Sequence, residues 1–179
     1  MRVGFILQVQ VIVALGALTS VHSKLELTNI KCISHDPDFA GFEYCLLKSI
    51  NRSYKYLSLK VKLFKVPITD IKVNLALAKK SSGYNPFLYN ITVDACRFLK
   101  YPKSNPVIGY MYDFFRAHSN MNHTCPYDHD LLVDKVTTNF INKHVTEVLP
   151  FPEGEFRFRS HWIAYGILRA TASVYATLS

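Results

Sequence analysis

Hydrophobic and polar residues alternate with a period of two along much of the chain, the pattern of half-buried antiparallel strands. The clearest stretches are residues 57–63 and 71–77, where every odd position is apolar, and a third runs over 87–94. In the first stretch Ser58, Lys60 and Lys62 are expected to face water. In the third, Asn90 falls on the outward face. One face of each strand is therefore predicted to cover a core.

Further strands are expected over residues 25–30, 43–50, 156–164 and 168–178, with a chain reversal near Gly166. Seven or so strands separated by turn residues predict a mainly β protein. The expected architecture is an immunoglobulin-like antiparallel β-sandwich of two sheets.

Two segments have helical spacing. Asn105 followed by Pro106 is a helix start, with an N-cap residue and a proline in the first turn. Residues 130–140 form a second, weaker helix prediction. The apolar stripe expected on the first helix is Val107, Tyr110, Met111, Phe114 and Phe115, and that on the second contains Leu131, Leu132, Lys135 and Val136.

The first 23 residues have the pattern of a cleaved secretory signal peptide. Arg2 precedes an apolar run over 3–18, and Val21 and Ser23 stand at the −3 and −1 positions of the expected cleavage site. A membrane anchor is the alternative, but the run is shorter than the roughly 20 residues that span a bilayer. Residues 24–179 are expected to form one secreted, extracellular domain.

The chain carries 21 basic and 13 acidic side chains, a net charge of +8. Loss of Arg2 with the leader lowers this to +7. Lysines alternate with apolar residues along strands, as in Lys60-Val61-Lys62, which favours a solvated strand face. No nucleic-acid partner and no stable membrane insertion are expected.

Four cysteines in an exported chain predict two disulfides. Three pairings are open, and we favour Cys32 with Cys45 and Cys96 with Cys125, because each pair closes a local loop. The second bridge would clamp a short helical insert. A zinc site using Cys125 with His118, His123 and His129 is the alternative, but the spacing matches no zinc motif.

Three N-glycosylation sequons begin at Asn51, Asn90 and Asn122. The sequence contains no nucleophile elbow, phosphate-binding glycine loop or HExxH helix. We therefore predict no catalytic residues, no metal, no cofactor and no enzyme activity.

Aromatic residues make up 13% of the chain, and several fall on inward or lid positions. Such side chains either fill a core at ordinary packing density or line an apolar ligand site. The residues proposed for an apolar pocket are Phe87, Tyr89, Phe114, Phe115, Phe158 and Trp162.

A series of motifs resembles one known family. The motifs are Cys32, Cys45, the segments 84–90 and 93–96, Asn122-His123-Thr124-Cys125-Pro126, and the prolines and glycine of 149–154. They resemble a large insect family of small secreted proteins classed as a domain of unknown function. That family lies near the ML, or lipid-recognition, domains, whose relatives include ganglioside-activator-like and contact-chemosensory proteins.

The resemblance implies an ML-like sandwich that opens between its sheets to hold a lipid. The expected function is a secreted, non-enzymatic binding protein for a lipid or hydrocarbon-like small molecule, with chemosensation as a setting and a cell-surface receptor as a candidate partner. The alternative is an extracellular interaction module with a filled core.

Overall fold

The computed structural model describes residues 24–51, 54–148 and 151–179. The expected signal peptide, Arg52 and Ser53 of the first sequon, and the Leu149-Pro150 pair lie outside these ranges.

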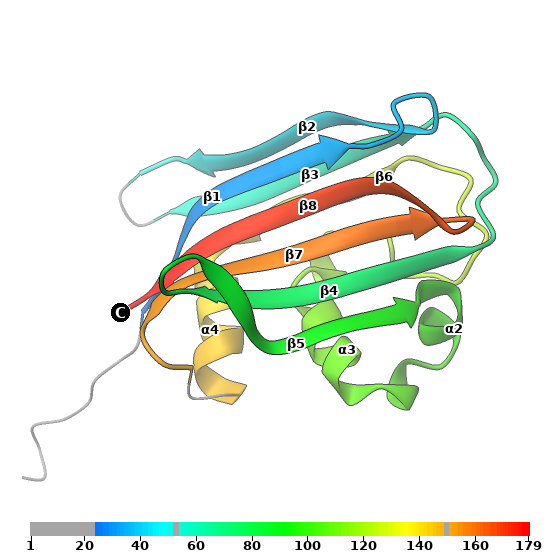
Figure 1. The fold of residues 1–179 in the computed structure, drawn as a ribbon. Helices are drawn as coiled ribbons and strands as arrows, with labels where there is room; N and C mark the ends of the chain where they lie inside the picture. Colours follow the sequence, from blue (N-terminus) through cyan, green and yellow to red (C-terminus); the bar gives the residue numbers. More distant parts are fainter. Residues whose placement is uncertain (1–23, 52–53, 149–150) are drawn as a thin grey trace, which may run out of the picture.

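The fold is a sandwich of two antiparallel sheets (Figure 1). The large sheet has the strand order β1-β8-β7-β4-β5, and the small sheet has the order β2-β3-β6. The large-sheet strands are β1 (Leu25–Ser34), β8 (Ile167–Leu178), β7 (Gly154–Ala164), β4 (Ile71–Lys80) and β5 (Tyr84–Asp94), and the small-sheet strands are β2 (Ala40–Ser49), β3 (Lys55–Leu63) and β6 (Leu131–Thr137). The predicted mainly β sandwich is confirmed.

The last two strands form the hairpin expected near Gly166. β7 and β8 pair along their whole length, and only Tyr165 and Gly166 separate them. Both residues have positive φ, 53° and 75°. Two central residues with positive φ make the tight hairpin turn whose twist matches that of the flanking strands.

A helical layer follows β5. It contains α2 (Ala95–Lys100), η1 (Pro102–Ser104), α3 (Pro106–Asp113) and η2 (Arg116–His118), and α4 (Thr138–Val148) is added after β6. The predicted helix start is confirmed, because the Asn105 side chain accepts a hydrogen bond from the Ile108 amide at 3.1 Å and Pro106 opens α3. Within the described ranges, no helix is long and apolar enough to cross a membrane.

The helix predicted over residues 130–140 is wrong. Residues 131–137 form strand β6, and helix begins only at Thr138. β6 contains a bulge at Lys135, where φ is 51° and the register with β3 shifts. An extra residue in a strand places inward side chains three positions apart instead of two. Val133 and Val136 are both buried, so their spacing imitates a helical stripe.

The bulge also corrects the expected orientation of Ser58, which is 4% exposed rather than facing water. Its hydroxyl accepts a hydrogen bond from the Lys135 amide at 2.8 Å and lies 3.1 Å from a carboxylate oxygen of Asp134. A polar side chain is therefore tolerated inside the small sheet because it satisfies the backbone at the bulge.

Both favoured disulfides are confirmed. Cys32–Cys45 joins β1 of the large sheet to β2 of the small sheet, with the Cα atoms 6.2 Å apart. Cys96–Cys125 joins α2 to the segment before β6, with the Cα atoms 5.2 Å apart. The first bridge holds the two sheets together, and the second encloses the helical insert.

Candidate functional site: an apolar cavity between the layers

A cavity of about 280 Å³ lies between the inner face of the large sheet, the small sheet and the helical layer. All eight described strands except β2 contribute side chains to its wall, as do α2, α3 and α4. Protein interiors normally contain few voids larger than a water molecule. This cavity, which is only partly enclosed, is therefore a feature of the fold and does not result from ordinary imperfect packing.

Among the residues that the structure describes, the wall is built almost wholly from aliphatic and aromatic side chains, and it contains no Asp, Glu, Lys, Arg or His. Strands β4, β7 and β8 supply its floor through the inward positions predicted from alternation. The floor residues are Ile71, Val73, Leu75, Leu77, Phe156, Phe158, Ser160, Trp162, Ala172, Val174, Ala176 and Leu178.

The few polar groups on the wall are mostly occupied by the protein itself. Within β7, the Trp162 indole donates to the Ser160 hydroxyl at 3.0 Å. That hydroxyl donates to the carbonyl of Ala172 on the neighbouring strand β8 at 3.4 Å. The Tyr112 hydroxyl donates to the Met121 carbonyl at 2.6 Å, and Tyr110 donates to the His144 carbonyl at 3.3 Å. Burial raises the pKa of both phenols.

Tyr89 differs from these groups. It projects from β5, an edge strand of the large sheet, and lines the cavity near Tyr110, yet its hydroxyl has no hydrogen-bond partner among the described residues. It is thus the wall group best suited to meet an oxygen atom of a ligand.

Five of the six residues proposed for the pocket line the cavity, namely Tyr89, Phe114, Phe115, Phe158 and Trp162. Phe87 does not. Its ring packs 5.5 Å from that of Phe156 and 6.4 Å from that of Phe151, and these two rings form the wall in front of it. Phe87 therefore supports the wall from behind.

Sequence reasoning missed the walls supplied by the small sheet and α4. The missed residues include Leu57, Leu59, Leu131, Val133, Val136, Ile141 and Val145. The alternation of apolar and polar residues did predict that Leu57 and Leu59 face the core. The wall residues on β6 and α4 were not predicted, because the bulge gives the buried residues of β6 the spacing of a helix.

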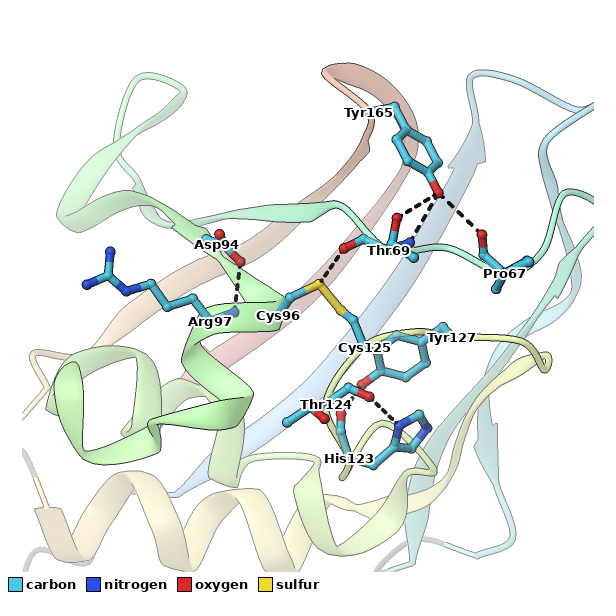
Figure 2. Close-up of a disulfide and its surroundings, with 10 residues drawn as sticks. All are labelled: Pro67, Thr69, Asp94, Cys96, Arg97, His123, Thr124, Cys125, Tyr127 and Tyr165. Carbon is cyan, nitrogen blue, oxygen red and sulfur yellow. Dashed lines mark hydrogen bonds between the residues drawn. A yellow bond between two sulfur atoms is a disulfide. The ribbon is translucent and has the colours of Figure 1, made fainter.

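The Cys96–Cys125 disulfide fastens one end of the helical layer (Figure 2). Asp94 caps α2 by accepting from the Arg97 amide at 2.8 Å, so Cys96 lies in the first turn of a fixed helix. The Cys96 sulfur lies 3.3 Å from the Thr69 carbonyl oxygen; because it is oxidised, this is a contact and not a hydrogen bond. The bridge thus joins α2 to the segment around Cys125 and contacts the loop preceding β4.

Tyr127 holds the segment after Cys125 against the loop preceding β4. It is 3% exposed, it lines the cavity, and its hydroxyl donates to the His123 carbonyl at 2.8 Å (Figure 2). Its backbone exchanges two hydrogen bonds with Ile68, at 2.7 and 2.9 Å. Burial raises the pKa of its phenol to about 12.

The raised pKa of Tyr127 gives a test of whether its phenol is shielded from water. The phenol ionises more readily in the unfolded chain, near pH 10, so the unfolded state binds fewer protons and stability falls as the pH rises from there. As the pH rises from about 9 to about 11, the free energy of unfolding should fall by about 1 kcal/mol less for the Tyr127→Phe variant than for the unmodified protein, because the variant has no phenol at this position. Urea unfolding at each pH measures this difference. Tyr101→Phe, which removes the hydroxyl group of an exposed phenol, is the control, and equal losses in both variants would contradict burial of the Tyr127 phenol.

A search of curated proteins gave no match. A protein-family comparison matches residues 73–158, from β4 through the helical layer and β6 to β7, with a family described as "Protein of unknown function (DUF1091)". In this segment, which includes the Cys96–Cys125 bridge and much of the cavity wall, the chain is similar to that family of unknown function.

Proposed function

We propose that this protein is a secreted, non-enzymatic binding protein that holds a lipid or other apolar ligand in the cavity between its layers. The observation that carries the proposal is the void of about 280 Å³ with an uncharged, apolar wall. An engineered apolar cavity of about 150 Å³ stays dry and binds benzene. The larger void here suits a ligand with an extended hydrocarbon portion.

The ligand that fits this wall is neutral. A carboxylate or phosphate inside would lie without a cationic partner, and burial of an unpaired charge is strongly unfavourable. A hydrocarbon, or a chain ending in a hydroxyl or carbonyl group that meets Tyr89, avoids that cost. The described part of the wall also lacks the carboxylates, histidines and free thiols that acid–base and nucleophilic catalysis employ, which supports a carrier over a hydrolase.

Two disulfides are compatible with an extracellular protein. The three sequon asparagines, Asn51, Asn90 and Asn122, are all exposed, so glycans can be accommodated at each. With the resemblance to lipid-recognition and contact-chemosensory proteins, these features support secretion and a role in chemosensation. The alternative, an interaction module with a filled core, predicts no such cavity.

The test is ligand uptake by protein secreted from insect cells. Native mass spectrometry before and after solvent extraction should reveal a co-purifying apolar molecule. The extracted protein should then bind N-phenyl-1-naphthylamine, and primary alcohols from decanol upward should displace this probe with about fourfold higher affinity per added methylene until the cavity is full. Fatty acid anions of equal length should compete more weakly.

Tyr89→Phe is the matched variant, because it removes only the free hydroxyl. It should weaken binding of the alcohols and leave binding of the corresponding alkanes unchanged. If the secreted protein carries no apolar molecule and the extracted protein takes up neither probe nor alcohol, the proposed function is wrong.

A further inference from the structure

The outer face of the large sheet carries a group of cations without acidic partners. The face is the one turned away from the small sheet and the helices, with β1, β8, β7, β4 and β5 crossing it (Figure 1). Arg157 and Arg159 occupy successive outward positions on the central strand β7, and Lys31 occupies an outward position on β1. We call Lys31, Arg157, Arg159, Tyr84 and Tyr175 the cationic face.

Strand register brings these residues together. Ser173 of β8 pairs with Lys31 on one side and with Arg159 on the other, so the two cations stand two strands apart, about 10 Å. Arg157 lies two residues along β7, about 7 Å from Arg159. These spacings are close to the Debye length at physiological salt, about 8 Å, so an anion near one cation experiences the others.

The side chains between the cations are small. Ala78 and Ala76 stand opposite Arg157 and Arg159, and they are 6% and 8% exposed although they point outward. The apolar stems of the arginines account for this coverage, since long cationic side chains pack their methylenes over small neighbours. The guanidinium groups are therefore laid along the sheet instead of extending freely into water.

Two other cations of the large sheet, Lys80 and Arg169, are paired. Lys80 lies 2.8 Å from Glu155, and Arg169 forms an ion pair with Asp36. In the described part of the chain, no carboxylate lies within 4 Å of Lys31, Arg157 or Arg159, and the buried Nε atoms of both arginines have no hydrogen-bond partner.

Aromatic rings hold two of these cations, Arg157 and Lys31, in position. The Arg157 guanidinium lies 4.7 Å from the centre of the Tyr84 ring, the Lys31 ammonium lies 5.9 Å from that of Tyr175, and the two rings are 5.6 Å apart. A cation–π contact orients a cation but leaves its charge in place. The face is thus preorganised and positively charged.

We infer that the cationic face binds a sulfated polysaccharide, independently of the cavity. Guanidinium groups match the oxygen atoms of sulfate with paired hydrogen bonds, and a linear polymer with repeated sulfates can meet cations about 7–10 Å apart at once. A bilayer fits this face less well. Peripheral membrane proteins combine cations with inserted apolar side chains. In the described ranges the exposed large apolar residues of this sheet are Ile33 and Leu88 on the edge strands β1 and β5 and Ile167 at the start of β8, and none lies on β4 or on β7, which carries the two arginines.

The test is binding of a heparin oligosaccharide as a function of salt concentration. The Arg157→Gln/Arg159→Gln variant should bind about tenfold or more weakly at physiological salt, and the slope of log affinity against log salt should fall by about 1.5. Lys48→Gln/Lys103→Gln is the matched control, because it removes the same charge from exposed lysines on β2 and η1 and should change affinity less than twofold. Uptake of N-phenyl-1-naphthylamine and the unfolding temperature report that each variant is folded.

Lys31→Gln provides a separate test at an exposed position where folding is not at risk, and a loss of several-fold is expected. Equal weakening by the two double variants would overturn the inference, because the binding would then reflect net charge alone. It would also be overturned if the arginine variant kept its heparin affinity but lost binding to vesicles of phosphatidylcholine and phosphatidylserine, which would identify a membrane-binding face.

Discussion

Replacing Ala172 with phenylalanine is expected to abolish uptake of apolar ligands while the protein remains folded. Ala172 is 5% exposed, points inward from β8 and lines the cavity, so the new ring enters the space proposed for the ligand. Larger side chains in a well-packed core usually cost about 1–3 kcal/mol. Here a void receives the ring, and filling a cavity commonly adds about 0.5–2 kcal/mol. Probe titration should show more than a tenfold loss of affinity, and urea unfolding should show stability equal to or above that of the unmodified protein.

Ala170→Phe is the matched control, since Ala170 lies two residues away on the same strand. It is 3% exposed but does not line the cavity, so the added ring has no void to occupy. This variant should lose about 1–3 kcal/mol of stability and keep its capacity for ligand. Ligand uptake by Ala172→Phe equal to that of the unmodified protein would mean that ligands bind elsewhere.

Removal of the Cys96–Cys125 bridge is expected to destabilise the protein and to weaken ligand binding together. The bridge closes a loop with a sequence separation of 29, for which loop-closure entropy predicts a loss of about 3–4 kcal/mol. It also fastens α2, which contributes Phe98 and Leu99 to the cavity wall. The Cys96→Ala/Cys125→Ala variant should therefore show both a lower urea midpoint and a several-fold weaker affinity for the probe.

The Cys32–Cys45 bridge provides the comparison. Its separation is 13, so its removal should cost about 3 kcal/mol, a similar amount. Neither cysteine lines the cavity, and the strands it joins stay paired within their own sheets. Cys32→Ala/Cys45→Ala should therefore lose stability with ligand affinity little changed. Equal effects of both variants on affinity would indicate that the second bridge acts through global stability alone.

Alternation in the sequence was sufficient to predict most strands, because each strand of the large sheet has one buried and one solvated face. The disulfides followed from the short loops that they close. Bulges caused the main errors. At Lys135 an extra residue disguised β6 as a helix, and near Leu88, where φ is 64°, a register shift between β4 and β5 separates Phe87 from the cavity that Tyr89 lines.

The cavity itself could not be predicted from the sequence. Apolar residues on inner strand faces are equally consistent with a filled core, and the outcome depends on how far the helical layer stands from the large sheet. That separation is set by contacts distant in sequence, such as the hydrogen bond from Tyr110 to the His144 carbonyl and the Ile68–Tyr127 pairing. The cationic face was missed for a related reason: Lys31 and Arg159 are far apart along the chain and meet only through the register of β8.

The void between the layers also determines how the protein responds to compression. Unfolding eliminates empty space inside a protein, so a fold with a partly enclosed apolar cavity of about 280 Å³ unfolds with a decrease in volume, and hydrostatic pressure favours that change. An apolar guest that occupies the space removes most of this volume difference. The empty protein should therefore be unusually sensitive to pressure and the loaded protein resistant, so that pressure distinguishes the two states without any optical label on the ligand.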